Sequence, residues 1–127
     1  HLLIEVELPV PIAHALRLQA AIGRGGHVPL HDLIADQLVR ANGDDPEGIR
    51  RLVRDSAVRG PLYEVLGRFP QSVVTAEAVL LWVEEPVPDV EALLALATEL
   101  AVGMASVARE VEPQAERRPS RLRVTAG

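Results

Sequence analysis

The sequence predicts a mostly helical protein that opens with a single short strand. Its 127 residues include one Phe, one Tyr and one Trp, so the core must be built from Leu, Val, Ile and Ala, which suit helix packing. Proline and glycine divide the chain into segments of helical length. Most of these segments repeat apolar residues at intervals of three and four, the spacing of one helix face.

Residues 2–9, LLIEVELP, predict the strand because apolar and polar positions alternate before a closing proline. Its apolar face is formed by Ile4, Val6 and Leu8. Its opposite face is largely acidic and is formed by Leu3, Glu5 and Glu7. A lone strand at the front of the chain would leave backbone groups unpaired, so we expect it to have a partner strand.

Two helices are expected after the strand. Pro11 suits a first helical turn, and the segment that follows has an apolar side before glycines at 23–26 break it. The second helix is expected from Pro29 to Asn42, with a stripe formed by Leu30, Leu33, Ile34 and Leu38. Residues 1–43 would therefore form a strand, helix, turn and helix.

Residues 44–112 are expected to add about four helices. Asp45 followed by Pro46 and Glu47 is a strong helix start. The inward side of that helix would be formed by Ile49, Leu52 and Val53. A shorter helix is expected from Gly60-Pro61 to Phe69. Residues 73–84 fit either a helix or a buried strand, and their Ala-Glu-Ala centre favours the helix.

The last helix is expected over residues 90–111, because its apolar residues step alternately by three and four. These residues are Val90, Leu93, Ala97, Leu100, Met104, Val107 and Val111. We expect this seam to pack in a helical bundle within the chain or across a dimer. Residues 113–127 are polar and rich in Arg, and we expect them to form a flexible tail.

Residues 2–42 resemble the ribbon-helix-helix superfamily. The resemblance lies in the order of the elements and in two stretches, ELPVPI at 7–12 and DLIADQL at 32–38. It implies an obligate homodimer in which Ile4, Val6 and Leu8 of two antiparallel strands face the helices. The outward Leu3, Glu5 and Glu7 would then enter the major groove of DNA.

Two functions remain open from the sequence. The resemblance implies a DNA-binding regulator of the repressor, antitoxin or partition-adaptor type. The alternative is a dimeric scaffold that keeps the ribbon for self-association and binds a protein, which the acidic outward face favours. The net charge of −5 argues mildly against a nucleic-acid partner.

Arginine supplies every basic residue, and several arginines are candidate contacts to phosphate or to a protein partner. The candidates are Arg24, Arg50, Arg51, Arg54, Arg117, Arg118, Arg121 and Arg123. The competing interpretation is that the group at 50–54, with Arg59, is a solvated helix face paired with Asp44, Asp45 and Asp55. The arginines of the tail would then serve solubility.

The sequence indicates no enzyme, cofactor or metal site. The chain has no Cys, no phosphate-binding loop ending in Lys, and no Ser in a nucleophile elbow. His27 and His31, with Asp32 and Asp36 nearby, suggest a metal site only faintly, because Pro29 lies between the imidazoles and no further ligand converges. We therefore expect a binding protein without catalytic residues.

The expected location is the bacterial cytoplasm, without membrane contact. No signal peptide is recognisable, and the all-Arg composition is typical of a GC-rich bacterial genome. The longest apolar run, 93–108, contains Glu99 and is short for a membrane span.

Overall fold

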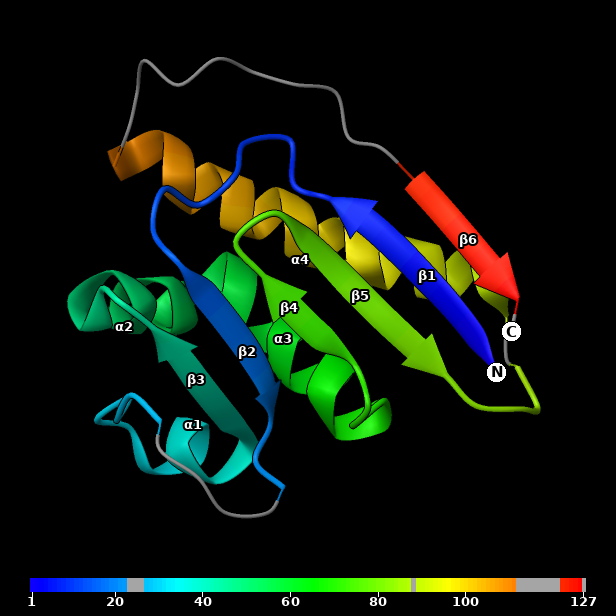
Figure 1. Cartoon of the computed structure of the whole chain (residues 1–127), viewed down its shortest axis with the longest axis horizontal. Coiled ribbons are helices and arrows are strands. Elements are labelled where there is room, and N and C mark those ends of the chain that lie inside the picture. Colours follow the sequence, from blue (N-terminus) through cyan, green and yellow to red (C-terminus); the bar gives the residue numbers. More distant parts are fainter. Residues whose placement is uncertain (23–26, 88, 112–121, 127) are drawn as a thin grey trace.

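The fold is a single antiparallel sheet with helices on one face (Figure 1). The computed structural model describes residues 1–22, 27–87, 89–111 and 122–126. Within these residues the chain forms six strands and four helices. The strand order is β3-β2-β4-β5-β1-β6, and every neighbouring pair is antiparallel.

The strands come from the whole length of the chain. They are β1 Leu2–Glu7, β2 Leu16–Ala20, β3 Val39–Gly43, β4 Val73–Thr75, β5 Ala78–Val83 and β6 Leu122–Ala126. The β4–β5 pair joins strands that are consecutive in the sequence, whereas β2 pairs with the distant β4, with Arg17 opposite Thr75. β1 lies between β5 and β6, so the first strand of the chain is inside the sheet.

The helices are α1 Leu33–Leu38, α2 Pro46–Arg54, α3 Ser56–Arg68 and α4 Val90–Val111. In Figure 1, α3 and α4 lie behind the sheet, and α1 and α2 lie beside β3. α4 contacts β1 and β5, while α3 contacts α4, α2 and β2. The helices therefore form one layer on one side of the strands.

The core lies between the sheet and this helix layer. Alternate residues of each strand face the helices, and in β1 and β5 these include Ile4, Val6, Val79 and Leu81, all 2% exposed or less. The facing side of α4 buries Leu93, Ala97, Leu100, Met104 and Val107. The core is aliphatic, as the composition predicted. One of its two packing surfaces is a sheet, where only helices were expected.

Helix α4 is long and apolar enough by composition to cross a membrane, but half of its apolar window is buried inside the protein. Its crossing with α3 is close at Gly103. A Cβ atom on that glycine would lie 2.6 Å from the carbonyl oxygen of Ala57. The small residue thus lets two helix backbones approach each other.

Aspartates begin the helices of this layer. The Asp45 Oδ1 atom accepts a hydrogen bond from the Gly48 N–H at 3.0 Å, and Pro46 follows it at the start of α2. The Asp55 Oδ1 atom accepts from the Ala57 N–H at 2.9 Å and caps α3. These side chains satisfy backbone donors that the first helical turn leaves unpaired.

The expectation of a mostly helical fold is wrong, and so is the expected helical bundle after residue 43. Residues 73–83 form β4 and β5 instead of a helix, and residues 16–20 form β2 where the first helix was expected. The second helix ends at Leu38, and β3 follows it directly. These segments are strands because their backbone groups pair across the sheet, which local spacing does not reveal.

The ribbon-helix-helix arrangement is also wrong. Both edges of β1 pair with strands of the same chain, Ile4 opposite Leu81 on one side and opposite Val124 on the other. No edge of β1 is left for a second chain. The predicted flexible tail is corrected in part, since residues 122–126 form β6, while residues 113–121 and 127 lie outside the described residues.

Candidate functional site

The face of the sheet that points away from the helices carries no helix of the described residues (Figure 1). We call the side chains on it the open face. From β1, β5 and β4 they are Leu3, Glu5, Glu7, Leu80, Trp82, Val73 and Thr75, and from β2 and β3 they are Arg17, Gln19, Arg40 and Asn42. All are half-buried except Arg17, which is exposed.

The strand register arranges the open face in rows that cross the sheet. The first row runs through Arg40, Gln19, Val73, Leu80 and Glu5. The second row runs from Asn42 and Arg17 through Thr75 and Ala78 to Glu7. In both rows a cation lies on the β2–β3 side, small or apolar residues lie in the middle, and a carboxylate lies on β1. The first row continues to position 123 of β6, an arginine opposite Glu5.

The end of the face next to these rows is apolar. Leu3 and Trp82 are directly opposite each other in the β1–β5 register. The ring of His1 stacks on Trp82, with centroids 3.8 Å apart and planes inclined by 17°. Trp82 also borders a hollow of about 430 Å³ that Phe69 and Pro70 line on the far side.

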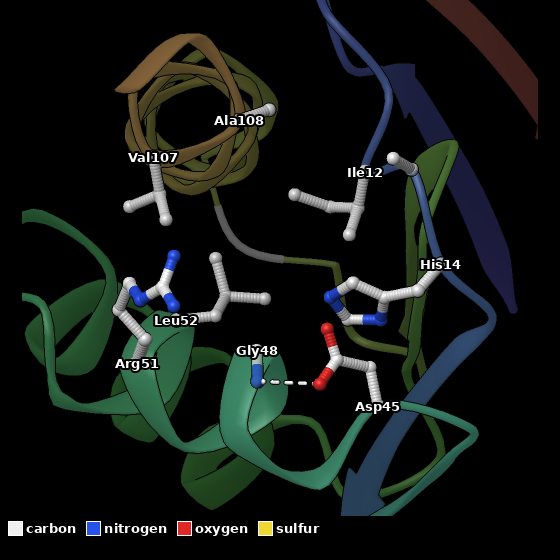
Figure 2. A pocket seen from close by; sticks show the side chains of 9 residues that line it. Ile12, His14, Asp45, Gly48, Arg51, Leu52, Val107 and Ala108 are labelled. Atoms are coloured by element: carbon white, nitrogen blue, oxygen red, sulfur yellow. Dashed lines mark hydrogen bonds between the residues drawn. The ribbon is translucent and has the colours of Figure 1, made fainter. Parts of the chain in front are cut away.

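A second candidate is a pocket between the β1–β2 loop, α2 and α4 (Figure 2). Its volume is about 90 Å³, and its lining residues are Ile12, Ala13, His14, Asp45, Gly48, Arg51, Leu52, Val107 and Ala108. The His14 imidazole and the Asp45 carboxylate point toward each other, and Arg51 stands at the α4 side. The pocket thus combines an apolar floor with three polar groups.

The polar groups of this pocket have structural roles. The Asp45 carboxylate caps α2, and the His14 Nδ1 atom lies 3.2 Å from the carbonyl oxygen of Ala15. Gly48 allows the two side chains to converge, since a Cβ there would lie 2.7 Å from His14 Nε2 and 2.5 Å from Asp45 Oδ2. The local sequence Asp-Pro-Glu-Gly therefore sets both the helix start and the pocket.

The chemistry of this pocket is limited by its size and lining. Substrate and cofactor pockets usually enclose about 300–1,000 Å³. Of the residues that line the pocket, none has a hydroxyl or thiol that could serve as a nucleophile. The space suits water or a small ion, so we regard the open face as the stronger functional candidate.

The residues of β1 that were predicted to point outward lie on the open face. The residues that were predicted to form the dimer ribbon lie on the opposite side of the sheet, against the helices. Leu3, Glu5 and Glu7 point away from the helices, and Ile4, Val6 and Leu8 are buried in the core. The sequence thus predicted the two sides of β1 correctly. The structure pairs this strand within its own chain.

Of the predicted basic contacts within the described residues, three lie on α2 and one lies on β6. Arg50 donates from Nε to the carbonyl oxygen of Pro29 at 2.8 Å and forms an ion pair with Glu47. Arg51 lines the pocket, and Arg54 is exposed on α2. Arg123 is a β6 position opposite Glu5. The remaining candidates lie outside the described residues, namely Arg24, Arg117, Arg118 and Arg121.

The residues of the faint metal hypothesis have backbone partners. Asp32 accepts from the Ala35 N–H at 3.0 Å and caps α1, and Asp36 accepts from the Leu30 N–H at 2.8 Å. Across residues 1–22, 27–87, 89–111 and 122–126, no three His, Asp or Glu side chains group as metal ligands would. These aspartates instead fix the turn before α1.

Sequence reasoning missed most of the open face. Leu80 and Trp82 were assigned to a helix, and Arg17 and Arg40 lay in predicted helices as well. The available signals were the alternation in LRLQA, where Leu16 and Leu18 are buried, and the unbroken apolar run AVLLWV, in which alternate residues from Val79 onward are buried. Alternation over five residues is a short pattern, and it competes with helical spacing.

Comparison with family models, with curated proteins and with solved structures found no match to this chain. The function proposed below therefore rests on the surfaces of the molecule itself.

Proposed function

We propose that this protein is a non-enzymatic protein-binding domain and that the open face is its binding surface. The observation that supports this most is the apolar centre of that face. Leu80 and Val73 are opposite each other on β5 and β4, the two central strands, and Trp82 is the next residue of β5 on the same face. An antiparallel sheet that only meets water usually presents polar residues there.

The distribution of polar groups supports the same role. Protein interfaces commonly have an apolar centre and a polar rim. On the open face the charged residues lie outside β4 and β5, with Arg17 and Arg40 on one side and Glu5 and Glu7 on the other. Such a rim can orient a partner while the central side chains lose their contact with water.

The open face gives less support to a DNA-binding role. A duplex attracts proteins chiefly through an excess of Lys and Arg on one surface. On β1 to β5, two arginines are balanced by two glutamates on this face. A DNA contact through a two-chain ribbon would also need a free edge on β1, which pairs on both sides.

Site-specific photo-crosslinking tests this proposal. A photo-reactive amino acid at position 80 is expected to form protein adducts in cells, whereas the same residue at position 99, exposed on α4, should not. Equal labelling from both positions, or none from position 80, would contradict the proposal. Retention on duplex DNA that falls steeply with salt would favour the DNA-binding class instead.

A further inference from the structure

We infer that the partner on the open face is a second copy of this chain, packed face to face. This inference rests on the function proposed above and names the partner of that surface. It follows from the second row, in which Arg17 on β2 and Glu7 on β1 lie on opposite sides of the face. A surface that carries complementary groups on its two sides can pair with itself through a two-fold axis.

The symmetry axis can be placed from the strand order. An axis parallel to the strands and midway between β4 and β5 exchanges the two sides of the face. It lays β4 of one copy over β5 of the other, and β2 of one copy over β1 of the other. Two sheets stacked in this way pack about 10 Å apart with their strands nearly aligned.

The second row then forms two equivalent ion pairs. Glu7 on β1 lies over Arg17 on β2 of the second copy, and the reciprocal pair forms across the axis. Within one chain, Glu7 and Arg17 are separated by three strand spacings of about 4.8 Å each, roughly 14 Å in all. Such a separation is too long for an ion pair within one sheet, so in a single copy water solvates both groups and both are available to an opposite charge on another molecule.

The first row supplies the apolar centre of the same interface. Leu80 of each copy lies over Val73 of the other, because these residues are opposite each other in the β4–β5 register. Thr75 and Ala78, at the turn between these strands, are small enough to let the sheets approach. The charged pairs therefore flank an aliphatic contact on the axis, which is the usual anatomy of an interface.

The size of the face indicates a weak dimer. Six strands about 4.8 Å apart and six residues at about 3.4 Å each give a footprint of roughly 24 by 20 Å. That is about 480 Å² per copy, below the roughly 800 Å² of a standard stable interface. We therefore expect association in the micromolar range.

Charge exchange between copies provides the test, read by sedimentation equilibrium on the full chain. In the homodimer of Glu7→Arg, both contacts between positions 7 and 17 become pairs of arginines. In the homodimer of Arg17→Glu, both contacts become pairs of glutamates. Each variant alone should dimerise at least about tenfold more weakly than the parent. An equimolar mixture should recover the parent affinity, because both pairs in the mixed dimer are then Arg with Glu.

The controls separate loss of pairing from loss of folding. Arg54→Glu and Glu99→Arg reverse exposed charges on α2 and α4 and should leave the association unchanged. Circular dichroism checks the fold of each variant, and the milder Glu7→Gln should weaken the dimer if Glu7→Arg fails to fold. A parent protein that is monomeric well above micromolar concentration, or a mixture that does not recover, would overturn the inference.

The crosslinking experiment distinguishes this inference from the function on which it rests. Adducts of the chain with itself from position 80 support both. Adducts with other proteins but none with itself would overturn the second-copy inference and leave the protein-binding function standing. The absence of any protein adduct at position 80 would remove both.

Discussion

The two faces of the sheet differ within a single strand. In β5, Leu81 is fully buried against the helix layer, while the preceding Leu80 is half-buried on the open face. The two residues are the same amino acid, and the pleat alone sends their side chains to opposite sides. The same amino acid therefore packs in the core on one face and stays partly exposed on the other.

The faces also differ in where they place charge. The strand residues on the covered face are aliphatic, whereas the open face includes Glu5, Glu7, Arg17 and Arg40. Burying an unpaired charge in an apolar core is strongly unfavourable, so these groups can lie only on the side that meets water or a partner. Four measurements test how the covered parts of the molecule differ from the exposed parts.

The largest effect is expected from Leu81→Ala compared with Leu80→Ala. Removing the buried side chain should lower the free energy of unfolding by about 2–5 kcal/mol through lost burial and a residual cavity. Removing the half-buried side chain of Leu80 should cost less than about 1 kcal/mol in the monomer. Urea unfolding measures both, and equal losses would mean that the open face is covered as well.

The next effect concerns the helix layer that covers the core. Gly103→Ala should destabilise the protein by about 1–3 kcal/mol, because the new Cβ would meet the Ala57 carbonyl at the α3–α4 crossing. Gly67→Ala is the matched control, since nothing lies within 4 Å of its Cβ position. It should raise stability by a few tenths to about 1 kcal/mol through helix propensity. The thermal unfolding midpoint should fall in Gly103→Ala and rise in Gly67→Ala, each relative to the parent protein.

A smaller effect is expected at the start of α3. Asp55→Ala removes the side chain that accepts the Ala57 N–H and should cost about 1 kcal/mol. Asp55→Asn keeps an oxygen in the same place and should cost little. Chemical denaturation measures the free energy of unfolding of both variants. Similar losses in both variants would indicate that the negative charge, rather than the cap, stabilises this helix.

The smallest effect is expected in the titration of Tyr63, which lies on α3 in the helix layer. Burial raises the pKa of Tyr63 above its ordinary value of 10.0, Asp32 raises it further, and Arg59 opposes them. The folded state then keeps the phenolic proton longer than the unfolded state does. Stability is therefore unaffected below pH 10 and declines as pH rises through the raised pKa.

Phenolate absorbance follows this group without interference, because the chain has a single Tyr. The midpoint should lie above 10.0 in the folded protein and should fall in Asp32→Asn, which retains a capping oxygen. It should rise further in Arg59→Gln. A midpoint at the ordinary value would mean that Tyr63 is fully solvated.

The elements that were predicted correctly carry strong local signals. The alternation in β1 identified its buried face, and the Asp-Pro start with Ile49, Leu52 and Val53 identified α2 and its inward side. The long seam of α4 identified a helix, and Leu93, Ala97 and Leu100 are buried as expected. In each segment the pattern and the end signals agree.

The other strands were missed because their local patterns are ambiguous. In 73–84 the Ala-Glu-Ala centre is the turn between β4 and β5, where the Thr75 hydroxyl accepts from the N–H groups of Glu77 and Ala78. A Thr hydroxyl bonded in this way competes with helix formation. β6 is held by pairing with β1, a contact between distant parts of the chain. No window of sequence contains that information.

The candidate site was predictable only at β1. Its outward residues were identified, but Arg17 and Leu80 join the same surface through the register of strands far apart in the sequence. Register depends on which strands become neighbours, and that is a property of the assembled sheet. A surface formed by several strands therefore cannot be predicted from the sequence of any one segment.

The position of β1 between β5 and β6 has a consequence for how the chain folds. During synthesis β1 must wait for Leu81 and its neighbours before it gains any ladder partner, and for Val124 before the second ladder closes. Contacts of such long sequence separation slow folding, because a large loop must be ordered before they form. We therefore expect β1 of a nascent chain to be a natural target for chaperones.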